Sequence, residues 1–530
     1  MTVTSTKAEL ASAAKSFIDC VEPATRRPLG KVRIDTPEDV KVAIDRARAA
    51  QVAFRASSFE TRRRVLTRML SHVIDHAEEL CELVCRVSGK TRENAMMGEI
   101  WPISEKLRWT IANGEKHLRP ERVSSGMLVH KKASIEYHPR GVVGAVVPWN
   151  YPLQNVLNLV IPSLMSGNAC LVKASEWVAF ASERFERIAQ EALEAEGFSK
   201  DLVRVLNGYG DTGKALVESG ADIVVFIGSV PNGRRVLEAS VKNLVPVVLE
   251  LGGKDPLIVC DDADLEQAVH AALGGTFINC GQNCVSSERI LVSERIAPAF
   301  ERRVTEEVSK FRQGASYQDG LCDVGGMVTP LQLELVERLV NKAIEQGARV
   351  VVGGRRVRSE QGSFFAPTIL ADVTPDMDIM QEEVFGPVML LCKVRDDEHA
   401  IEVANGSRFG LGGSVFSKDQ ARARRIADRL EAGMISINDF GGLTYMAQDL
   451  PFGGVKESGF GRMNGRDGLR SLCQARAVLE DRFPLHVPSK VFPVGAGDFE
   501  RTKHVVELMY GPDLGRRLRG LRGLLGVKSR

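Results

Sequence analysis

The sequence predicts an α/β protein in which parallel sheets carry helices on both faces. Short apolar segments such as ACLVKA, IVVFIG and PVVLELG alternate with helical patterns, an order typical of parallel strands joined by crossover helices. A second alternating stretch runs from about residue 256 to 440. The chain has 530 residues, too many for one ordinary core, so we expect two or three domains.

The expected elements follow the chain in order. Helical patterns dominate residues 36–117, and the segment 133–149 predicts two β segments with a turn near Pro139–Gly141. The alternation then begins, with helices expected at about 177–196 and 231–243 between the apolar strands.

Composition excludes several classes of protein. The apolar content of 44% and charged content of 26% are typical of a soluble globular chain, and a net charge of +2 argues against a nucleic-acid partner. The N-terminus, MTVTSTKAELASAAKSF, lacks the apolar core of a signal peptide, and no run of 18 apolar residues occurs. Ten thinly spread cysteines indicate a reducing compartment, so we expect a cytoplasmic protein.

One cluster, SHVIDHAEELCELVC, contains His72, His76, Cys81 and Cys85 and could suggest a metal site. If the segment is one helix, the two histidines lie on one side and the two cysteines on the other. Four ligands on opposite faces cannot enclose one ion, so we expect packing and solvated positions here and no metal.

Two glycine-rich segments are candidates for binding a dinucleotide. NGYGDTG (207–213) is a formal G-x-G-x-x-G, but Asp222 stands at the start of the next strand rather than its end, so an ordinary loop explains the segment equally well. IVVFIGSVPNGRRV fits better, because a strand ends at Gly228 and a helix begins within a turn, with Gly233 on its first turn. Such a helix N-terminus can bind a pyrophosphate.

Another strand, in LVKASEW, ends with Lys173 and Glu176. From the carboxyl edge of a sheet these side chains could hold ribose hydroxyls, although a surface lysine and glutamate are more often simply solvated.

Three segments carry the side chains that acyl chemistry needs. VVPWNYPL ends a strand with Asn150, VVLELGGKDP ends another with Glu250, and TFINCGQNCVSSERI holds Cys280 and Cys284. A thiolate can attack a carbonyl, an amide with a backbone N–H can stabilise the oxyanion, and a carboxylate can activate water. A metal ligand, a disulfide or buried packing are the other interpretations of the two cysteines.

With EEVFGPV (382–388) and PFGGVKESGFGR (451–462), these segments resemble the aldehyde dehydrogenase superfamily over roughly residues 17–480. The resemblance implies that Cys284 is the nucleophile, Glu250 the general base and Asn150 the oxyanion-hole amide, and leaves Cys280 as a packing residue. It implies cofactor contacts from Pro148, Trp149, Lys173, Glu176, Gly228, Gly233, Glu383 and Phe385. It places Tyr151, Asn155, Asn158, Asn283, Val285, Tyr445 and Met446 around the substrate.

The family architecture also implies a division of the chain. We expect a Rossmann-like cofactor domain at 1–120 and 141–252, an α/β catalytic domain at 253–467, a small β oligomerisation arm at 121–140 and 468–482, and an extension at 483–530. A homodimer or homotetramer is therefore expected.

The resemblance implies an NAD(P)-dependent enzyme that oxidises an aldehyde to the acid without CoA. A carboxylate at Glu176 would repel a 2′-phosphate, which favours NAD over NADP. The pocket segments contain no Arg or Lys, and Asp449 would repel a distal carboxylate, so we expect uncharged aldehydes. We also expect the Cys284 thiol to be partly ionised near neutral pH, helped by a helix N-terminus or a cation.

Two alternatives stay open. CoA-acylating relatives pass the acyl group to CoA, but they typically lack the glutamate that stands here at Glu250. A catalytically silent binding protein on the same fold would be expected to have lost catalytic side chains that this chain keeps.

The C-terminal extension begins near a Pro- and Gly-rich segment at 484–497 and ends in LGRRLRGLRGLLGVKSR, with six basic residues and no acidic one. As a helix, this stretch (514–530) would carry a leucine stripe with arginines largely off it, which favours contact with an anionic membrane, and it resembles a membrane-associated plant and fungal subgroup. Four glycines weaken such a helix by about 1 kcal/mol each. The other interpretation is a tail that is disordered or docks its leucines on the enzyme. The leucines are Leu514, Leu518, Leu521 and Leu525, and the glycines Gly515, Gly520, Gly523 and Gly526.

Overall fold

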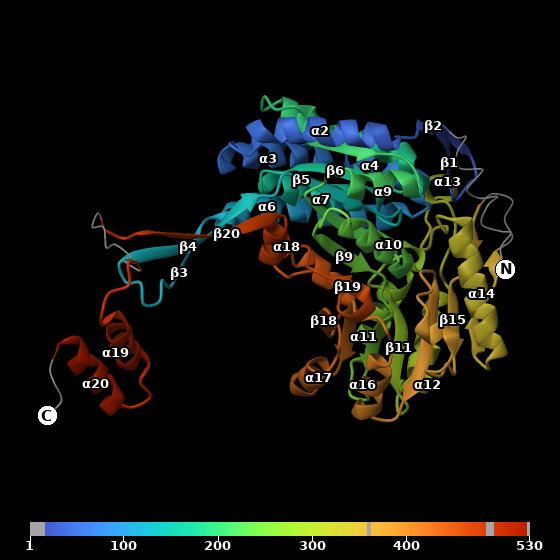
Figure 1. Ribbon diagram of the computed structural model, residues 1–530. Coiled ribbons are helices and arrows are strands. Elements are labelled where there is room, and N and C mark those ends of the chain that lie inside the picture. Colours follow the sequence, from blue (N-terminus) through green and yellow to red (C-terminus); the bar gives the residue numbers. More distant parts are fainter. Residues whose placement is uncertain (1–15, 358–361, 484–491, 527–530) are drawn as a thin grey trace, which may run out of the picture. The chain divides into compact units, whose positions relative to one another are not determined.

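The computed structural model describes residues 16–357, 362–483 and 492–526. Its contacts separate two compact units: Met1–Pro120 with Glu136–Arg476, and Glu121–Ile135 with Ala477–Arg530. The first unit contains two large, mostly parallel sheets surrounded by helices (Figure 1). The predicted α/β class is confirmed. Parts of the expected cofactor domain (1–15) and extension lie outside the described residues.

The first large sheet has six strands in the order β19-β9-β8-β5-β6-β7. Strands β5 to β9 run parallel, and β19 pairs antiparallel with β9 at the edge. These strands are continuous apolar runs because both faces of the sheet are covered. Their bounds are β5 (Val142–Val146), β6 (Ala169–Lys173), β7 (Val203–Leu206), β8 (Ile223–Gly228), β9 (Val247–Leu251) and β19 (Gly459–Phe460).

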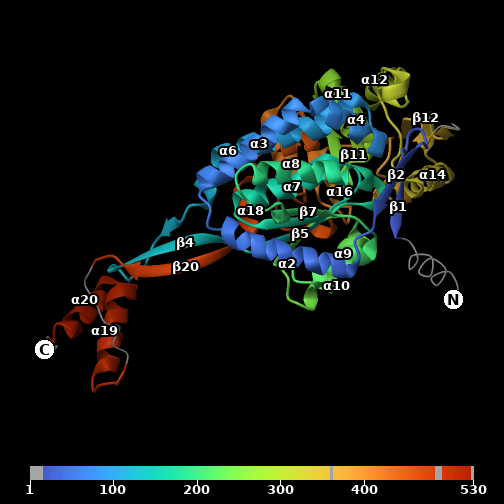
Figure 2. The same ribbon diagram turned by 90° about the horizontal axis from the view of Figure 1, so that it is seen from above.

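Helices cover both faces of this sheet (Figure 2). One face contacts α2, α9 and α10; the other contacts α7 and α8, on which α3 and α6 form a further layer. Helix α7 is buried on nearly every side, which its apolar sequence permits. The bounds are α2 (Pro37–Phe54), α3 (Phe59–Asp75), α6 (Trp101–Leu118), α7 (Pro152–Met165), α8 (Ser182–Glu194), α9 (Gly210–Glu218) and α10 (Val230–Val241).

Two expected helices are divided in the structure. The stretch predicted at 177–196 forms a 3₁₀ turn, η2 (Glu176–Ala181), before α8, because Val178 has a non-helical φ of −121°. The segment with the histidine and cysteine pairs is also broken, since α3 ends at Asp75 and α4 spans Ala77–Ser88. His72 therefore lies on α3, His76 between the two helices, and both cysteines on α4.

The second large sheet has seven strands in the order β12-β15-β16-β11-β10-β17-β18, all parallel except β12. Helices α11 and α12 contact β11, and α16 contacts β10 and β16. The bounds are β10 (Asp255–Val259), β11 (Ser287–Ser293), β12 (Arg349–Val352), β15 (Thr368–Ala371), β16 (Val388–Val394), β17 (Gly412–Phe416), β18 (Met434–Ile437), α11 (Leu265–Phe277), α12 (Ala297–Val308) and α16 (Asp397–Asn405).

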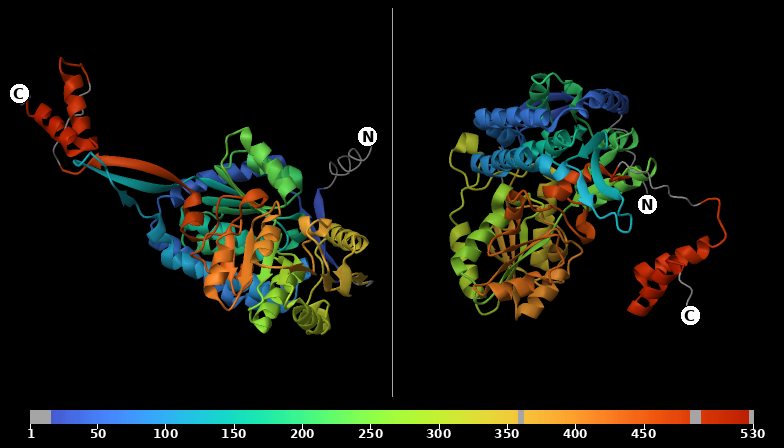
Figure 3. Two further views of the ribbon diagram at one scale, coloured as in Figure 1. Left: turned by 90° about the horizontal axis from the view of Figure 1, so that it is seen from below. Right: turned by 90° about the vertical axis from the view of Figure 1, so that its left-hand side faces the viewer.

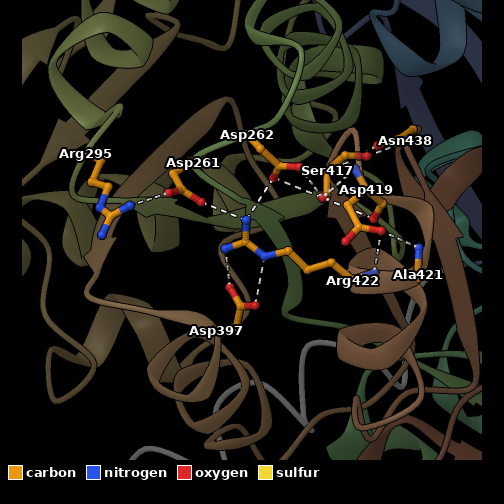
Figure 4. Close-up of polar contacts among 9 residues, drawn as sticks. All are labelled: Asp261, Asp262, Arg295, Asp397, Ser417, Asp419, Ala421, Arg422 and Asn438. Carbon is orange, nitrogen blue, oxygen red and sulfur yellow. Dashed lines mark hydrogen bonds and ion pairs between the residues drawn. The ribbon is translucent and has the colours of Figure 1, made fainter.

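An arginine ties together the carboxyl edge of this second sheet (Figure 4). Arg422, on α17 (Gln420–Ala427), donates to both carboxylate oxygens of Asp397 at 2.9 and 2.6 Å, to Asp261 at 2.7 Å and to Asp262 at 3.0 Å. Arg295 donates to Asp261 at 2.9 Å. The loop after β10 is thereby joined to the starts of α16 and α17.

Shorter elements complete the first unit. Two antiparallel pairs are β1 (Phe17–Val21) with β2 (Pro28–Arg33), and β13 (Arg356–Val357) with β14 (Phe364–Phe365). The remaining helical segments are α5 (Arg92–Ala95), the π-helical turn η1 (Met96–Ile100), α13 (Ser316–Asp319), α14 (Pro330–Glu345), α15 (Asp378–Gln381), α18 (Gly465–Ser471), and the 3₁₀ turns η3 (Lys200–Leu202), η4 (Ile278–Gly281), η5 (Gly441–Met446) and η6 (Lys456–Ser458).

A three-stranded sheet in the order β20-β4-β3 occupies the region of the expected β arm. Its strands are β3 (Glu121–Val123), β4 (Lys131–Pro139) and β20 (Cys473–Asp481). The strand expected from about 468 begins at Cys473, because the preceding residues form α18.

Two helices of the extension pack side by side as a hairpin (Figure 3). They are α19 (Asp498–Tyr510) and α20 (Leu514–Leu524). A Cβ on Gly520 would lie 2.5 Å from the carbonyl oxygen of His504, and one on Gly523 would lie 2.4 Å from the His504 ring. These glycines, expected to weaken the helix, instead let α20 approach α19 closely, and that packing offsets their poor helix propensity.

Candidate active site

A single cavity of about 730 Å³ gathers almost all the predicted site residues. It lies where the carboxyl ends of β5, β6, β8 and β9 meet the loop that precedes β11. Gly233 is the exception, since it does not line the cavity. The predicted residues that do are Pro148, Trp149, Asn150, Tyr151, Asn155, Asn158, Lys173, Glu176, Gly228, Glu250, Asn283, Cys284, Val285, Glu383, Phe385, Tyr445 and Met446.

The loop that carries Cys284 is held in a strained conformation. Asn279 and Cys280 adopt φ values of 53° and 57°, the left-handed region that costs free energy for residues other than glycine. Asn279 donates from Nδ2 to the carbonyls of Asn150 and Gln282, both at 2.9 Å, and Gln282 donates back to the Asn279 carbonyl at 3.1 Å. These buried bonds fix the loop and expose the thiol of Cys284 to the cavity.

Cys280 faces away from the reactive region. Its side chain is 1% exposed, and its sulfur lies 3.7 Å from the sulfur of Met327. Burial raises the pKa of this thiol. Cys280 and Cys284 are both free thiols, which excludes the disulfide interpretation for this structure.

Two hydrogen-bond donors flank the thiol. Asn150 accepts at Oδ1 from Asn155 and donates at Nδ2 to the Gln282 carbonyl, each at 3.2 Å, while Lys90 donates to its backbone oxygen at 2.9 Å. The second hydrogen of the Asn150 amide stays available. The backbone N–H of Cys284 meets no acceptor among the described residues. The Asn150 amide and the Cys284 backbone N–H can therefore donate hydrogen bonds to a negatively charged oxygen that forms in the cavity.

Glu250 is a buried carboxylate at the wall of the cavity. It extends from β9, is 2% exposed, and its Oε1 atom has no hydrogen-bond partner among the described residues. Burial raises the pKa of Glu250 to about 7, an effect that the neighbouring Cys284 thiol partly opposes. A carboxylate of this pKa is well matched to proton transfer at neutral pH.

The expectation of a partly ionised Cys284 is not met. Burial, followed by the nearby charge of Glu250, raises the thiol pKa well above its ordinary value. The further charged groups that act on the thiol, Glu383 and Asp255, are acidic and raise it more. The charged groups that dominate this shift are thus all acidic, and the Glu250 carboxylate is the one that also hydrogen-bonds the thiol.

The carboxyl end of β6 presents an ion pair to the cavity. Lys173 Nζ lies 3.5 Å from Glu176 Oε2, and the Ser175 hydroxyl donates to the same carboxylate oxygen at 3.3 Å. Burial lowers the pKa of Lys173. Sequence reasoning placed both side chains correctly, because strand ends of a parallel sheet share one edge.

Strand β8 ends at Gly228, and α10 begins two residues later beside the cavity. A Cβ on Gly233 would lie 2.6 Å from Leu251, so this glycine allows α10 to pack closely on β9. Gly233 thus supports the helix rather than lining the cavity.

Glu383 and Phe385 come from the loop before β16. Glu383 accepts from the backbone N–H of Gly253 at 3.1 Å, and a Cβ on Gly252 would lie 2.1 Å from its Oε2 atom. The rings of Phe385 and Trp149 meet edge to face with centroids 5.5 Å apart.

Comparison with known proteins identifies the chain. The model of the aldehyde dehydrogenase family matches residues 10–478. The chain belongs to the aldehyde dehydrogenase family. It is 38% identical over 473 residues to an aldehyde dehydrogenase-like protein of Schizosaccharomyces pombe, covering 88% of this chain and 90% of the relative.

Other relatives of this aldehyde dehydrogenase differ in the substrates that their names state. A 4,4'-diapolycopene aldehyde oxidase of a Methylomonas species is 34% identical and covers 94% of this chain and 92% of its own length. The solved structure of betaine aldehyde dehydrogenase from Staphylococcus aureus with NAD+ is 32% identical, with a TM-score of 0.83, and covers 90% of this chain and 94% of its own. The predicted Rossmann-like and catalytic architecture is confirmed.

The chain is an NAD(P)-dependent aldehyde dehydrogenase, and its cavity fits such a cofactor. The first turn of α10 offers a helix N-terminus to a pyrophosphate, and the Lys173–Glu176 pair lies at the strand edge where ribose hydroxyls bind. Glu383 packs closely against Gly252, and its carboxylate lines the same cavity.

Sequence reasoning missed one wall of the substrate side. Met97 and Gly98 in η1, and Trp101 and Pro102 in α6, also line the cavity. Gly98 is required there, because a Cβ would lie 2.7 Å from the Tyr151 ring. The exposed apolar residues Met97 and Trp101 at the start of a helix were the available signal.

The role expected for Asp449 was wrong. Asp449 is exposed and does not line the cavity, because the chain turns outward after η5 has placed Tyr445 and Met446 at the wall. The charged residues that do line it are Lys173, Glu176, Glu250 and Glu383.

A buried lysine stands behind the substrate wall. Lys106 donates to the side-chain oxygens of Asn158 and, at 2.6 Å, of Asn464; burial lowers its pKa to about 7. The Tyr445 hydroxyl donates to the same Asn158 oxygen at 2.9 Å. The sequence does not indicate that Lys106 holds Asn158 in this way, because a single lysine in a helical pattern is usually a solvated surface residue.

The described residues contain no group of three or more His, Cys, Asp or Glu side chains arranged to hold a metal ion. None of their helices has the length and apolarity needed to span a membrane.

Proposed function

We propose that this aldehyde dehydrogenase oxidises uncharged aldehydes to carboxylic acids through a thioester on Cys284, with water as the final acceptor and NAD as the preferred cofactor. The observation that carries the proposal is the pairing of a half-buried Cys284 thiol, which faces the cavity, with a buried Glu250 carboxylate whose pKa is raised to about 7.

In the first half of the reaction, the Cys284 thiol gives its proton to Glu250 and the sulfur attacks the aldehyde carbon. A C–S bond forms, and the carbonyl oxygen becomes an oxyanion that the Asn150 amide and the Cys284 backbone N–H stabilise. Bound NAD supplies the hydride acceptor that converts the thiohemiacetal to a thioester.

In the second half, Glu250 first releases the thiol proton to solvent; the carboxylate then takes a proton from water, and the water oxygen attacks the thioester carbon. The C–S bond breaks, the acid leaves, and Cys284 regains a proton. A buried carboxylate beside the thiol supports hydrolysis over transfer to CoA. It also argues against a silent binding protein, because a desolvated acid with one unpartnered oxygen is costly to keep without a catalytic role.

The preference for uncharged aldehydes rests on the substrate wall. Apolar and aromatic side chains from η1, α6 and η5 line the cavity around the thiol, and none of the described arginines or lysines lines it on that side. A distal carboxylate would lose its hydration there without a cation in contact. Relatives whose names state succinate semialdehyde or betaine aldehyde are 34% and 35% identical, so the names alone do not decide.

The preference for NAD rests on Glu176. Its carboxylate can accept bonds from a ribose 2′-hydroxyl, whereas a 2′-phosphate would bring two like charges together. Equal or higher kcat/KM with NADP would overturn this preference.

The decisive assay uses the purified chain with uncharged aldehydes of two to sixteen carbons and with succinate semialdehyde. Each is tested with NAD and NADP, with and without CoA. We expect NADH and free acid from the uncharged aldehydes with no dependence on CoA. Acyl-CoA formation favours the CoA reaction, absence of turnover favours a silent protein, and efficient succinate-semialdehyde oxidation contradicts the substrate assignment.

We further propose that the β3–β4–β20 sheet is the oligomerisation arm of a homodimer or homotetramer. Exposed Val123 on β3 and exposed Leu479 on β20, the two edge strands of this sheet, support association through this region.

For the extension we propose peripheral contact with an anionic membrane. The α19–α20 hairpin leaves Leu514, Leu518 and Leu521 at 73%, 44% and 40% exposure, and Arg519 and Arg522 are exposed on the same helix. Apolar side chains beside cations fit a surface of anionic headgroups. Two of the six predicted basic residues lie in 527–530, outside the described residues.

A further inference from the structure

A buried carboxylate four residues after Cys284 holds the backbone of the loop that carries Glu383 and Phe385. Glu288 lies on β11 and is 1% exposed. It accepts from the backbone N–H of Val384 at 2.9 and 3.1 Å and from that of Phe385 at 2.9 Å. Consecutive amides bound by one ionised carboxylate make a strong, directional contact.

The charge of Glu288 is balanced within the same buried cluster. Lys254, in the turn between β9 and β10, is 1% exposed and donates to Glu288. Arg289 donates to the Lys254 carbonyl at 2.8 Å and so holds that turn. Such a pair is tolerated in the interior because the Glu288 carboxylate also accepts from the Val384 and Phe385 amides.

The loop that Glu288 holds is strained. Phe385 has a φ of 50°, a conformation that a bulky residue adopts only when its surroundings impose it. On the other side, Gln332 donates to the Val384 carbonyl at 2.8 Å. The backbone of Val384 is therefore fixed at both its N–H and its carbonyl group.

This loop touches both halves of the site. Glu383 accepts from Gly253 at 3.1 Å, beside the strand that bears Glu250. The Gly386 carbonyl lies so close to the thiol loop that a Cβ on Gly281 would be 2.0 Å from it. A shift of the loop would consequently move the Glu383 carboxylate relative to the thiol.

We infer that Glu288, with Lys254, is a positioning residue that presets Glu383 and Phe385 to contact the bound cofactor. The inference rests on the proposed function and on the cofactor contacts that the family resemblance implies for Glu383 and Phe385, both of which line the cavity. Glu288 itself touches neither the cavity nor the reacting atoms.

The test compares Glu288→Gln with Glu382→Gln, a matched change on the same loop. Glu382 is 42% exposed and pairs only with Arg338, at 3.3 Å, among the interactions recorded for it. Cofactor affinity is measured without turnover, by titrating NAD against the fluorescence of the full-length protein, in which Trp149 and Trp177 line the cavity. We expect Glu288→Gln to weaken NAD binding about tenfold or more, as when buried donors lose their acceptor, and Glu382→Gln to change it less than about twofold.

Steady-state kinetics separate positioning from general loss of structure. Glu288→Gln should raise the KM for NAD while changing the KM for the aldehyde less than about twofold. Because removal of one charge can destabilise the core, the double variant Lys254→Met/Glu288→Met is measured as well. A stable double variant that still binds NAD weakly supports positioning of the loop amides.

Three results have distinct meanings. NAD binding by Glu288→Gln equal to wild type, or restored in the double variant, overturns this inference and leaves the proposed function intact. A KM for aldehyde that rises in step with the KM for NAD also overturns it. No saturable binding of NAD or NADP by the wild type would instead refute the proposed function.

Discussion

Asn150 donates from Nδ2 to the backbone carbonyl of Gln282 at 3.2 Å, and this bond joins the loop after β5 to the loop that carries Cys284. The two loops lie 132 residues apart in the chain. The contact aligns the amide with the thiol before any substrate arrives, so no reorganisation is needed when the oxyanion forms.

Asn150→Ala should therefore remove one oxyanion donor and loosen the thiol loop. We expect kcat to fall by roughly 10²–10³-fold, the usual cost of losing such a donor. Asn243→Ala, which removes an exposed amide bonded to the Glu218 carbonyl, is the control. A kcat for Asn150→Ala within a few-fold of wild type would exclude Asn150 from the oxyanion hole.

Cys284→Ala should abolish aldehyde oxidation, because no other thiol reaches the cavity among the described residues. Cys280→Ala should keep most of the activity and lower the free energy of unfolding by about 1–2 kcal/mol, since a buried packing sulfur is lost. Turnover assays and denaturant titrations measure both effects. The reverse pattern would mean that Cys280 is the nucleophile.

The pH dependence of kcat should follow the ionisation of the Glu250 carboxyl group. Its carboxyl pKa is raised to about 7 by burial, so the ionised base predominates above that pH and is lost below it. We expect kcat to decrease about tenfold per pH unit below pH 7 when deacylation limits the rate.

Glu250→Gln should lower steady-state turnover by about 10²–10⁴-fold, the usual contribution of a general base. A first-turnover burst of NADH that survives in this variant would assign Glu250 chiefly to deacylation. Loss of the burst would show that proton removal from Cys284 also needs it. A steady-state rate equal to that of wild type would remove Glu250 from the mechanism.

Arg422→Met should destabilise the second large sheet. Three aspartates, Asp261, Asp262 and Asp397, lose their shared donor, and we expect a loss of about 1–3 kcal/mol at neutral pH. Arg424→Met, on the same helix but paired only with the exposed Asp428, should cost less than about 0.5 kcal/mol.

The destabilisation caused by Arg422→Met should be smaller at acidic pH. The hydrogen bond from Arg422 comes first among the effects that hold the pKa of Asp261 below 3.8. A lowered folded pKa gives stability that is present above 3.8 and disappears as the pH falls through the folded value. Urea unfolding at pH 7 and near pH 3 measures this, and an equal difference at both pH values would contradict it.

Deletion of residues 512–530 should abolish salt-sensitive binding to anionic vesicles. Each cation near such a surface contributes on the order of 1 kcal/mol, so binding by the full chain should weaken as salt is added. Sedimentation with phosphatidylserine vesicles measures it, with neutral phosphatidylcholine vesicles as control. Equal binding by the full-length and truncated proteins, or none by either at low salt, would leave the tail a structural element.

The sequence by itself determined which apolar strands carry the motifs and which residues gather at the cavity. Lys173, Gly228 and Glu250 lie at the ends of apolar strands, and Asn150 lies in the loop after another. The carboxyl ends of parallel strands share an edge, so local patterns were sufficient to bring these residues together. Cys284 was identified by its motif before its surroundings were known.

Only the tertiary structure decided how those groups behave. The pKa of Cys284 depends on burial and on the nearby Glu250. The exclusion of Asp449 from the cavity depends on the turn after η5, and the role of Gly520 depends on its contact with α19. Each of these depends on distances between segments far apart in the chain. The burial that shifts a pKa and the close packing of side chains both arise only when such segments come into contact. A local sequence pattern contains no information about those contacts.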